Sequence, residues 1–263
     1  MGTDTDRNFI ERMTWDEVAR HLGNGAAAIL PVGAAAKEHG FHLPLNTDRI
    51  QAEWLASQLA ARFDALIWPT LAYGYYPAFV AYAGSSSLSS ATFEAVVYEI
   101  ASGILGNGCR RLFVLNTGIS TLAPVERALA RLDGGKVTHL RIHEGPRYRQ
   151  AAERLAEQNH GSHADELETS LMLALAPHLV DMTRAEPSPA IGLEAPGPLT
   201  PLDTNSPNYS RSGSYGDPTL ATSAKGEILL AAMLDDLREQ VAAFVAEETA
   251  ASQRPGAARS VSR

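Results

Sequence analysis

The densest group of side chains suited to metal binding or acid–base chemistry lies in residues 37–48, K-E-H-G-F-H-L-P-L-N-T-D. Imidazole and carboxylate groups are the ligands that a borderline divalent ion prefers, so Zn²⁺, Mn²⁺ and Fe²⁺ all suit this segment. Gly40 and Pro44 predict a shaped loop, in which ligands need not follow helical spacing. A solvated polar loop with Asp48 as a helix cap is the alternative, and residue types alone leave both open. The possible ligands are Glu38, His39, His42 and Asp48.

A second polar cluster, N-H-G-S-H-A-D-E-L-E-T-S, covers residues 159–170 at the start of a predicted helix. His163 suits a general acid or base, because the ordinary pKa of histidine lies near neutrality. Glu168 follows five residues later, not quite on the same helical face. Acidic side chains also stabilise the first turn of a helix through its dipole, so a plain helix start is the alternative.

A third feature, residues 116–121 (N-T-G-I-S-T), follows an apolar run directly and offers amide and hydroxyl groups but no metal ligand. Such a segment suits either hydrogen bonding to a ligand or an ordinary turn. A Gly- and Tyr-rich loop at residues 70–79 contains Tyr73 and Tyr76, which either line a pocket or simply pack.

Short apolar runs alternate along the chain with longer segments of helical periodicity. This alternation predicts an α/β fold with a parallel sheet that helices cover on both faces. Ligands of such sheets bind beyond the carboxyl ends of the strands. The Pro-, Gly- and Ser-rich stretch 187–217 predicts a long surface loop. Strands are predicted at 26–32, 65–69, 112–115 and 137–142, and helices at 48–62, 90–106, 122–132, 163–178 and 222–248.

Composition restricts the class of protein. A net charge of −8 argues against nucleic acid or an anionic membrane as the main partner. The single cysteine, Cys109, excludes an intramolecular disulfide. The polar N-terminal segment is unlike a signal peptide and no apolar run is long enough to span a membrane, so we expect a cytoplasmic protein. We predict a single domain over residues 1–250 and a disordered tail over 251–263.

The segment LPVGAAAKEHGFHLPLNTD resembles PVGxxEQHGxHLPxxTD, the opening signature of the creatininase (creatinine amidohydrolase) family. Further similarities follow in family order and cover most of residues 14–245. They are YGYYPAFVAYAGSSSL, LGNGCRRLFVLNTG, HADELETSLMLAL and YGDPTLATSAKGEILLAAM.

The resemblance implies a three-layer αβα domain around a mainly parallel sheet, often assembled as a homo-hexamer. It also implies hydrolysis of C–N bonds with Zn²⁺, Mn²⁺ or Fe²⁺. Activities known in the family include opening the cyclic amide of creatinine, deformylating a pyrimidine intermediate and trimming a peptide precursor of a redox cofactor.

Carried onto this chain, the family's HG histidine falls on His39 and the aspartate that bridges two metals falls on Asp48. The signature glutamate falls on Lys37, and one extra residue before His39 leads us to predict that Glu38 takes its place. The later family ligands, in NGHxE, are missing, because this chain has Asn-Thr-Gly and then Ser120. A two-metal centre is therefore not expected.

We predict instead one divalent ion (Zn, Mn or Fe) held by Glu38, His39 and Asp48, with His42 nearby, since three ligands and an open position suffice for catalysis. His163 and Glu168 match the family's HAGExE. His163 is expected to handle protons and Glu168 to orient His163 or water, and His42 is included with them as a catalytic residue. The residues predicted to contact substrate are Tyr73, Tyr76, Asn116, Ser120 and Thr121.

The expected substrate is a small non-peptide amide, lactam or formamide. Two alternatives stay open at this point. One is a cyclase, lyase or isomerase that works in the altered pocket without an activated metal water. The other is a catalytically inactive paralogue that binds a ligand or stabilises another subunit.

Overall fold

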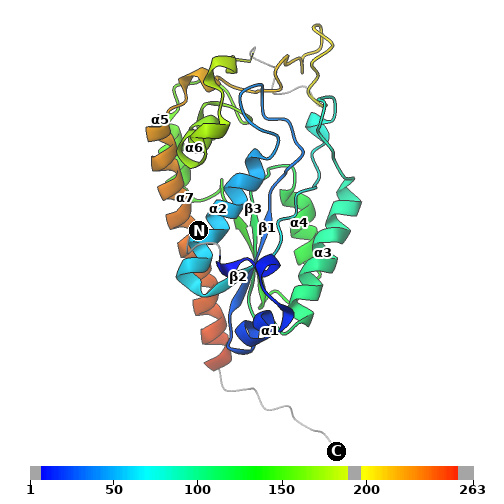
Figure 1. Cartoon of the computed structure of the whole chain (residues 1–263), viewed down its shortest axis with the longest axis vertical. Helices are drawn as coiled ribbons and strands as arrows, with labels where there is room; N and C mark the ends of the chain where they lie inside the picture. The colour runs from blue at the N-terminus through cyan, green and yellow to red at the C-terminus, as the bar shows by residue number, and fades with distance from the viewer. Residues whose placement is uncertain (1–6, 189–196, 254–263) are drawn as a thin grey trace, which may run out of the picture.

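A four-stranded parallel sheet forms the centre of the protein, for which a computed structural model describes residues 7–188 and 197–253. The strands lie in the order β2-β1-β3-β4 (Figure 1). All six residues of β1 are buried, which explains why its sequence is apolar throughout. The strands are β1 (Ala27–Val32), β2 (Ala65–Ile67), β3 (Leu112–Asn116) and β4 (Val137–Arg141), so the predicted parallel α/β sheet is confirmed.

The register brings three strand ends together. Val32 at the end of β1 pairs with Asn116 at the end of β3, and Asn116 pairs with Arg141 at the end of β4. The loops that begin after these residues therefore leave the sheet at one edge, where ligands of parallel sheets bind.

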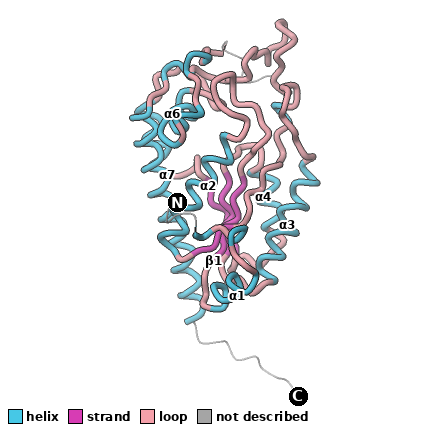
Figure 2. The backbone as a smooth tube through the Cα atoms, in the orientation of Figure 1, coloured by secondary structure: helices cyan, strands magenta, loops and turns pink. Residues whose placement is uncertain are grey.

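Helices enclose the sheet on both faces, and Figure 2 shows the strands between two helical layers. Alternate strand residues supply the two cores: Ile29 and Phe113 pack on one side, Leu30 and Val114 on the other. The first side is covered by α2 (Thr47–Phe63), α5 (Pro146–Leu155), α6 (Glu166–Leu175) and α7 (Ser223–Gln253), and the second by α1 (Trp15–Gly23), α3 (Ser90–Gly106) and α4 (Leu122–Leu129). No helix within the described ranges is long and apolar enough to cross a membrane.

Several boundaries differ from the predictions. Helices α1 and α5 lie outside the predicted elements, although Thr14 and Glu17 form a capping box at the start of α1. Helix α7 ends at Gln253 and so includes the first three residues of the segment predicted as a tail, and 254–263 lie outside the described residues. The described parts of 187–217 contain no helix or strand, as expected for a long loop.

The contact between α6 and α7 depends on a glycine. A Cβ added at Gly226 would lie 1.9 Å from the backbone oxygen of Ser170, whereas one added at Gly103 in α3 meets nothing within 4 Å. We expect Gly226→Ala to lower the free energy of unfolding by about 1–3 kcal/mol through overpacking. Gly103→Ala is expected to raise it by roughly 0.5–1 kcal/mol, because alanine favours helix. Urea unfolding measures both, and equal effects of the two variants would contradict this account of the interface.

Candidate active site

A cavity of about 490 Å³ opens at the carboxyl edge of the sheet. It collects residues from parts of the chain that are distant in sequence, including the loops that follow all four strands and the segment leading into α6. Its lining includes Lys37, Asp48, Phe79, Ser120, His143, His163 and Glu168. The first and second polar clusters of the sequence therefore meet in one place.

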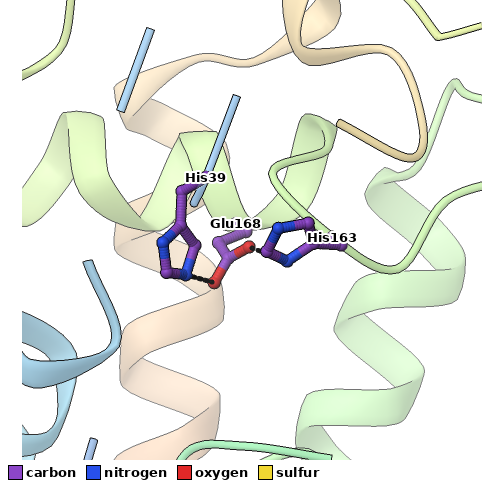
Figure 3. A group of neighbouring side chains, drawn as sticks. All are labelled: His39, His163 and Glu168. Atoms are coloured by element: carbon purple, nitrogen blue, oxygen red, sulfur yellow. Dashed lines mark ion pairs between the residues drawn. The ribbon is translucent and has the colours of Figure 1, made fainter. Parts of the chain in front are cut away.

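His39, His163 and Glu168 form a compact donor group. One ligand atom from each lies within 4.8 Å of the others (Figure 3). The Glu168 carboxylate lies between the two rings, with Oε1 3.8 Å from His39 Nε2 and Oε2 3.8 Å from His163 Nδ1. This geometry can hold one divalent cation.

Hydrogen bonds fix the orientation of both rings. His39 Nδ1 lies 2.9 Å from the carbonyl oxygen of Lys37, and His163 Nε2 lies 2.7 Å from Glu38 Oε1. Both partners are acceptors, so these two nitrogens carry hydrogen and donate. The other nitrogen of each ring lies near the Glu168 carboxylate, where a bound divalent ion would take the place of a proton. Histidine ligands of metals are oriented in this way by a carbonyl or carboxylate, so the donor group fits a borderline divalent ion.

Glu38, predicted as a metal ligand, uses both of its carboxylate oxygens elsewhere. Oε1 accepts from His163, and Oε2 accepts from the Gly40 N–H at 2.9 Å. Gly213 leaves room for this carboxylate, because a Cβ there would lie 1.9 Å from Oε2. Burial alone would raise the pKa of Glu38. The charge of His163 and its hydrogen bond act in the opposite direction, and the pKa is lowered overall, so the carboxyl is ionised. Glu38 thus orients the candidate ligand His163 and is not a member of the donor group, and its direct contact with metal stays a prediction.

Asp48, the second predicted ligand, forms a buried ion pair with Lys37. The Lys37 Nζ lies 2.7 Å from Asp48 Oδ2, although the angle is poor for a directed hydrogen bond. Asp48 Oδ1 lies 3.2 Å from His39 Nε2. Burial raises the pKa of Asp48, but the Lys37 and His39 charges outweigh it and lower that pKa overall. Asp48 is not the helix cap considered from sequence: it lies in the first turn of α2 and is 3% exposed.

Of the other two residues predicted to be catalytic beside His163, Glu168 lines the cavity and His42 does not. Glu168 is held by the Ala164 N–H, which donates to Oε2 at 2.7 Å. Ala164 adopts a left-handed conformation with φ of 46°, and α6 consequently begins at Glu166 rather than at 163. His42 does not line the cavity: its Nε2 contacts Thr169 Oγ1 at 2.8 Å, and burial lowers its pKa to about 4. His42 is therefore a neutral, buried neighbour of the site.

Of the residues predicted to contact substrate, Ser120 lines the cavity, although its hydroxyl donates to the Tyr75 carbonyl. Asn116 and Thr121 are buried and bond to each other through the Thr121 hydroxyl at 2.7 Å, which builds the turn after β3. Tyr73 is exposed and Tyr76 is buried below Lys37, and neither lines the cavity. Substrate contact by all five residues stays a prediction.

Lys37 and His143 are among the cavity residues that were absent from the predicted site. The sequence contained an indication for Lys37, because this residue occupies the position of the glutamate in the creatininase signature that the segment resembles. His143 lies two residues beyond the end of β4, which is a usual position for functional side chains in parallel sheets. Its Nε2 lies 3.2 Å from the Thr117 carbonyl oxygen, which leaves the rest of the ring against the cavity.

Comparison with known proteins places these residues in a family context. Residues 11–241 match the creatininase family model, described as creatinine amidohydrolase. Creatinine amidohydrolase of Pseudomonas putida is 28% identical over 256 residues, covering 89% of this chain and 95% of the relative. A mycofactocin precursor peptide peptidase of Mycobacterium tuberculosis is 29% identical over 231 residues, covering 82% of this chain and 85% of the relative.

Solved structures agree with the family match. A crystal structure of creatinine amidohydrolase (creatininase) has a TM-score of 0.72 at 27% identity, covering 95% of this chain and 99% of that chain. A structure called "Creatininase Mn" has a TM-score of 0.73 at 25% identity, covering 94% and 99%. The arrangement of helices around the parallel sheet is thus that of the creatininases.

Proposed function

Because this chain belongs to the creatininase family, we propose that it is a metal-dependent amidohydrolase acting on a small substrate. The bond cleaved is a C–N bond of a cyclic amide, a formamide or a related non-peptide compound, and the enzyme uses one divalent ion. The observation that carries this proposal is the donor group of His39, His163 and Glu168, with both histidines buried, at a cavity on the carboxyl edge of the sheet.

His39, His163 and Glu168 would hold the ion. A divalent ion bound there polarises a carbonyl oxygen and makes water more acidic, which is the chemistry that amide hydrolysis requires. Zinc, manganese and iron all suit two imidazoles and a carboxylate. Manganese and zinc also appear in the names of two related creatininase structures.

The chain's own residues prepare this site in two ways. Glu38 accepts the Nε2–H of His163 and so keeps Nδ1 directed at Glu168. The Phe79 ring packs on His163 with 4.2 Å between centroids and keeps water from that side of the ring. His143 offers a ring to the cavity that can exchange a proton with a bound substrate.

The volume of the cavity supports a small substrate. About 490 Å³ lies within the usual range for small-molecule pockets. A relative named as a peptide peptidase makes a short peptide the competing substrate class. Lactams, formamides and short peptides therefore belong in one screen.

The test combines metal content with turnover. Full-length protein is stripped with a chelator, reloaded with Zn²⁺, Mn²⁺ or Fe²⁺, and screened for release of amine or formate. The proposal expects about one equivalent of metal and hydrolysis that follows metal loading. A product isomeric with its substrate would instead indicate a cyclase or isomerase. Ligand binding without turnover in any loaded form would indicate an inactive paralogue.

A further inference from the structure

Lys37 is a buried cation that lines the cavity near the donor group of His39, His163 and Glu168. Its Nζ contacts Asp48 Oδ2 at 2.7 Å, while Asp48 Oδ1 lies 3.2 Å from His39 Nε2, a member of the donor group. The two oxygens of one carboxylate thus face an ammonium on one side and a candidate metal ligand on the other. In the resembling family signature, this aspartate bridges two metals.

The surroundings hold the ammonium in place. Lys37 is 6% exposed, and Nζ lies 5.2 Å from the centroid of the Phe79 ring and 5.7 Å from that of Tyr76. Aromatic faces attract a cation at such distances, most strongly where water is excluded. The Lys37 backbone is also bound at both ends, through its N–H to Leu45 and its carbonyl to His39. The side chain is therefore part of the site rather than a surface lysine that has folded inward.

We propose that the Lys37 ammonium takes the place of a second cation, so that this chain binds at most one divalent ion. This inference rests on the proposed function, since it concerns the same site. A divalent ion on Asp48 Oδ2 would lie next to the ammonium, and like charges at a few ångströms repel strongly where water is scarce. Lys37 neutralises Asp48 without an exchangeable metal, and the donor group remains for one ion.

Isothermal titration with Zn²⁺ or Mn²⁺ of the chelator-stripped full chain tests this directly. Three proteins are compared: wild type, Lys37→Gln, and Lys136→Gln as a control in which the same change is made at an exposed lysine. Wild type and the control are expected to take up one equivalent. Lys37→Gln is expected either to take up a second equivalent or to bind the first at least about ten-fold more tightly, because it loses a nearby positive charge.

Each outcome decides the question. Two equivalents in wild type, or identical stoichiometry and affinity in Lys37→Gln and wild type, overturns the role of Lys37. Uptake by Lys37→Gln but none by wild type supports that role and overturns the single-metal hydrolase. No uptake by either protein overturns both.

Loss of the ion pair can destabilise Lys37→Gln, so thermal melts with and without Mn²⁺ accompany the titration. A metal-induced rise in Tm that is larger in Lys37→Gln than in wild type supports the proposal. An equal rise contradicts it, even if the metal-free variant is largely unfolded.

Discussion

Glu168→Gln is expected to lower kcat/KM by about 10³-fold or more, which corresponds to roughly 4 kcal/mol of lost transition-state stabilisation. Glu168 supplies the carboxylate between His39 and His163, and a neutral amide is a far weaker ligand for a divalent ion. The amide oxygen of glutamine can still accept from the Ala164 N–H, so the fold should be retained. Metal affinity, measured by competition with a chromogenic chelator, is expected to fall in parallel with activity.

Glu153→Gln is the matched control, because Glu153 is an exposed residue of α5 outside the lining of the cavity. It should leave both activity and metal affinity unchanged. If Glu168→Gln kept the metal affinity of wild type while losing activity, Glu168 would act on the substrate or on a proton and not as a ligand.

Glu166→Ala is expected to lower the free energy of unfolding by about 3–5 kcal/mol, the usual cost of removing one partner from a buried ion pair. Glu166 is fully buried, accepts from the backbone N–H groups of Glu157 and Gln158, and pairs with Lys225 at 2.5 Å. The substitution leaves these two N–H donors without their acceptor and removes one of the two carboxylates that pair with the Lys225 ammonium. Urea unfolding followed by circular dichroism measures the loss.

Glu153→Ala serves as the control, since it removes a carboxylate that is exposed to solvent, and its effect should stay within about 0.5 kcal/mol. A free energy of unfolding for Glu166→Ala close to that of wild type would show that water replaces the carboxylate, contrary to the structural role assigned to it.

The polar cluster at residues 159–170 illustrates how far the sequence alone could be interpreted. From sequence it was either a functional group or a plain helix start, and in the structure its residues lie both in the donor group and at the start of α6. His163 and Glu168 belong to the donor group, whereas Asp165 caps α6 by accepting from the Leu167 and Glu168 N–H groups. Residue type could not separate these roles, because a carboxylate acquires its role from the groups that face it.

The sequence by itself determined the parallel α/β fold, because strand and helix periodicities are local properties of the chain. It also determined that polar segments follow the ends of β1 and β3. Which atoms meet there depends on the tertiary structure. The strand register places the strand ends at one edge of the sheet, and Glu38 contacts His163 instead of joining the donor group. The tertiary structure likewise placed the Lys37 ammonium on Asp48, since ion pairing depends on distance and burial, which spacing along a loop does not specify.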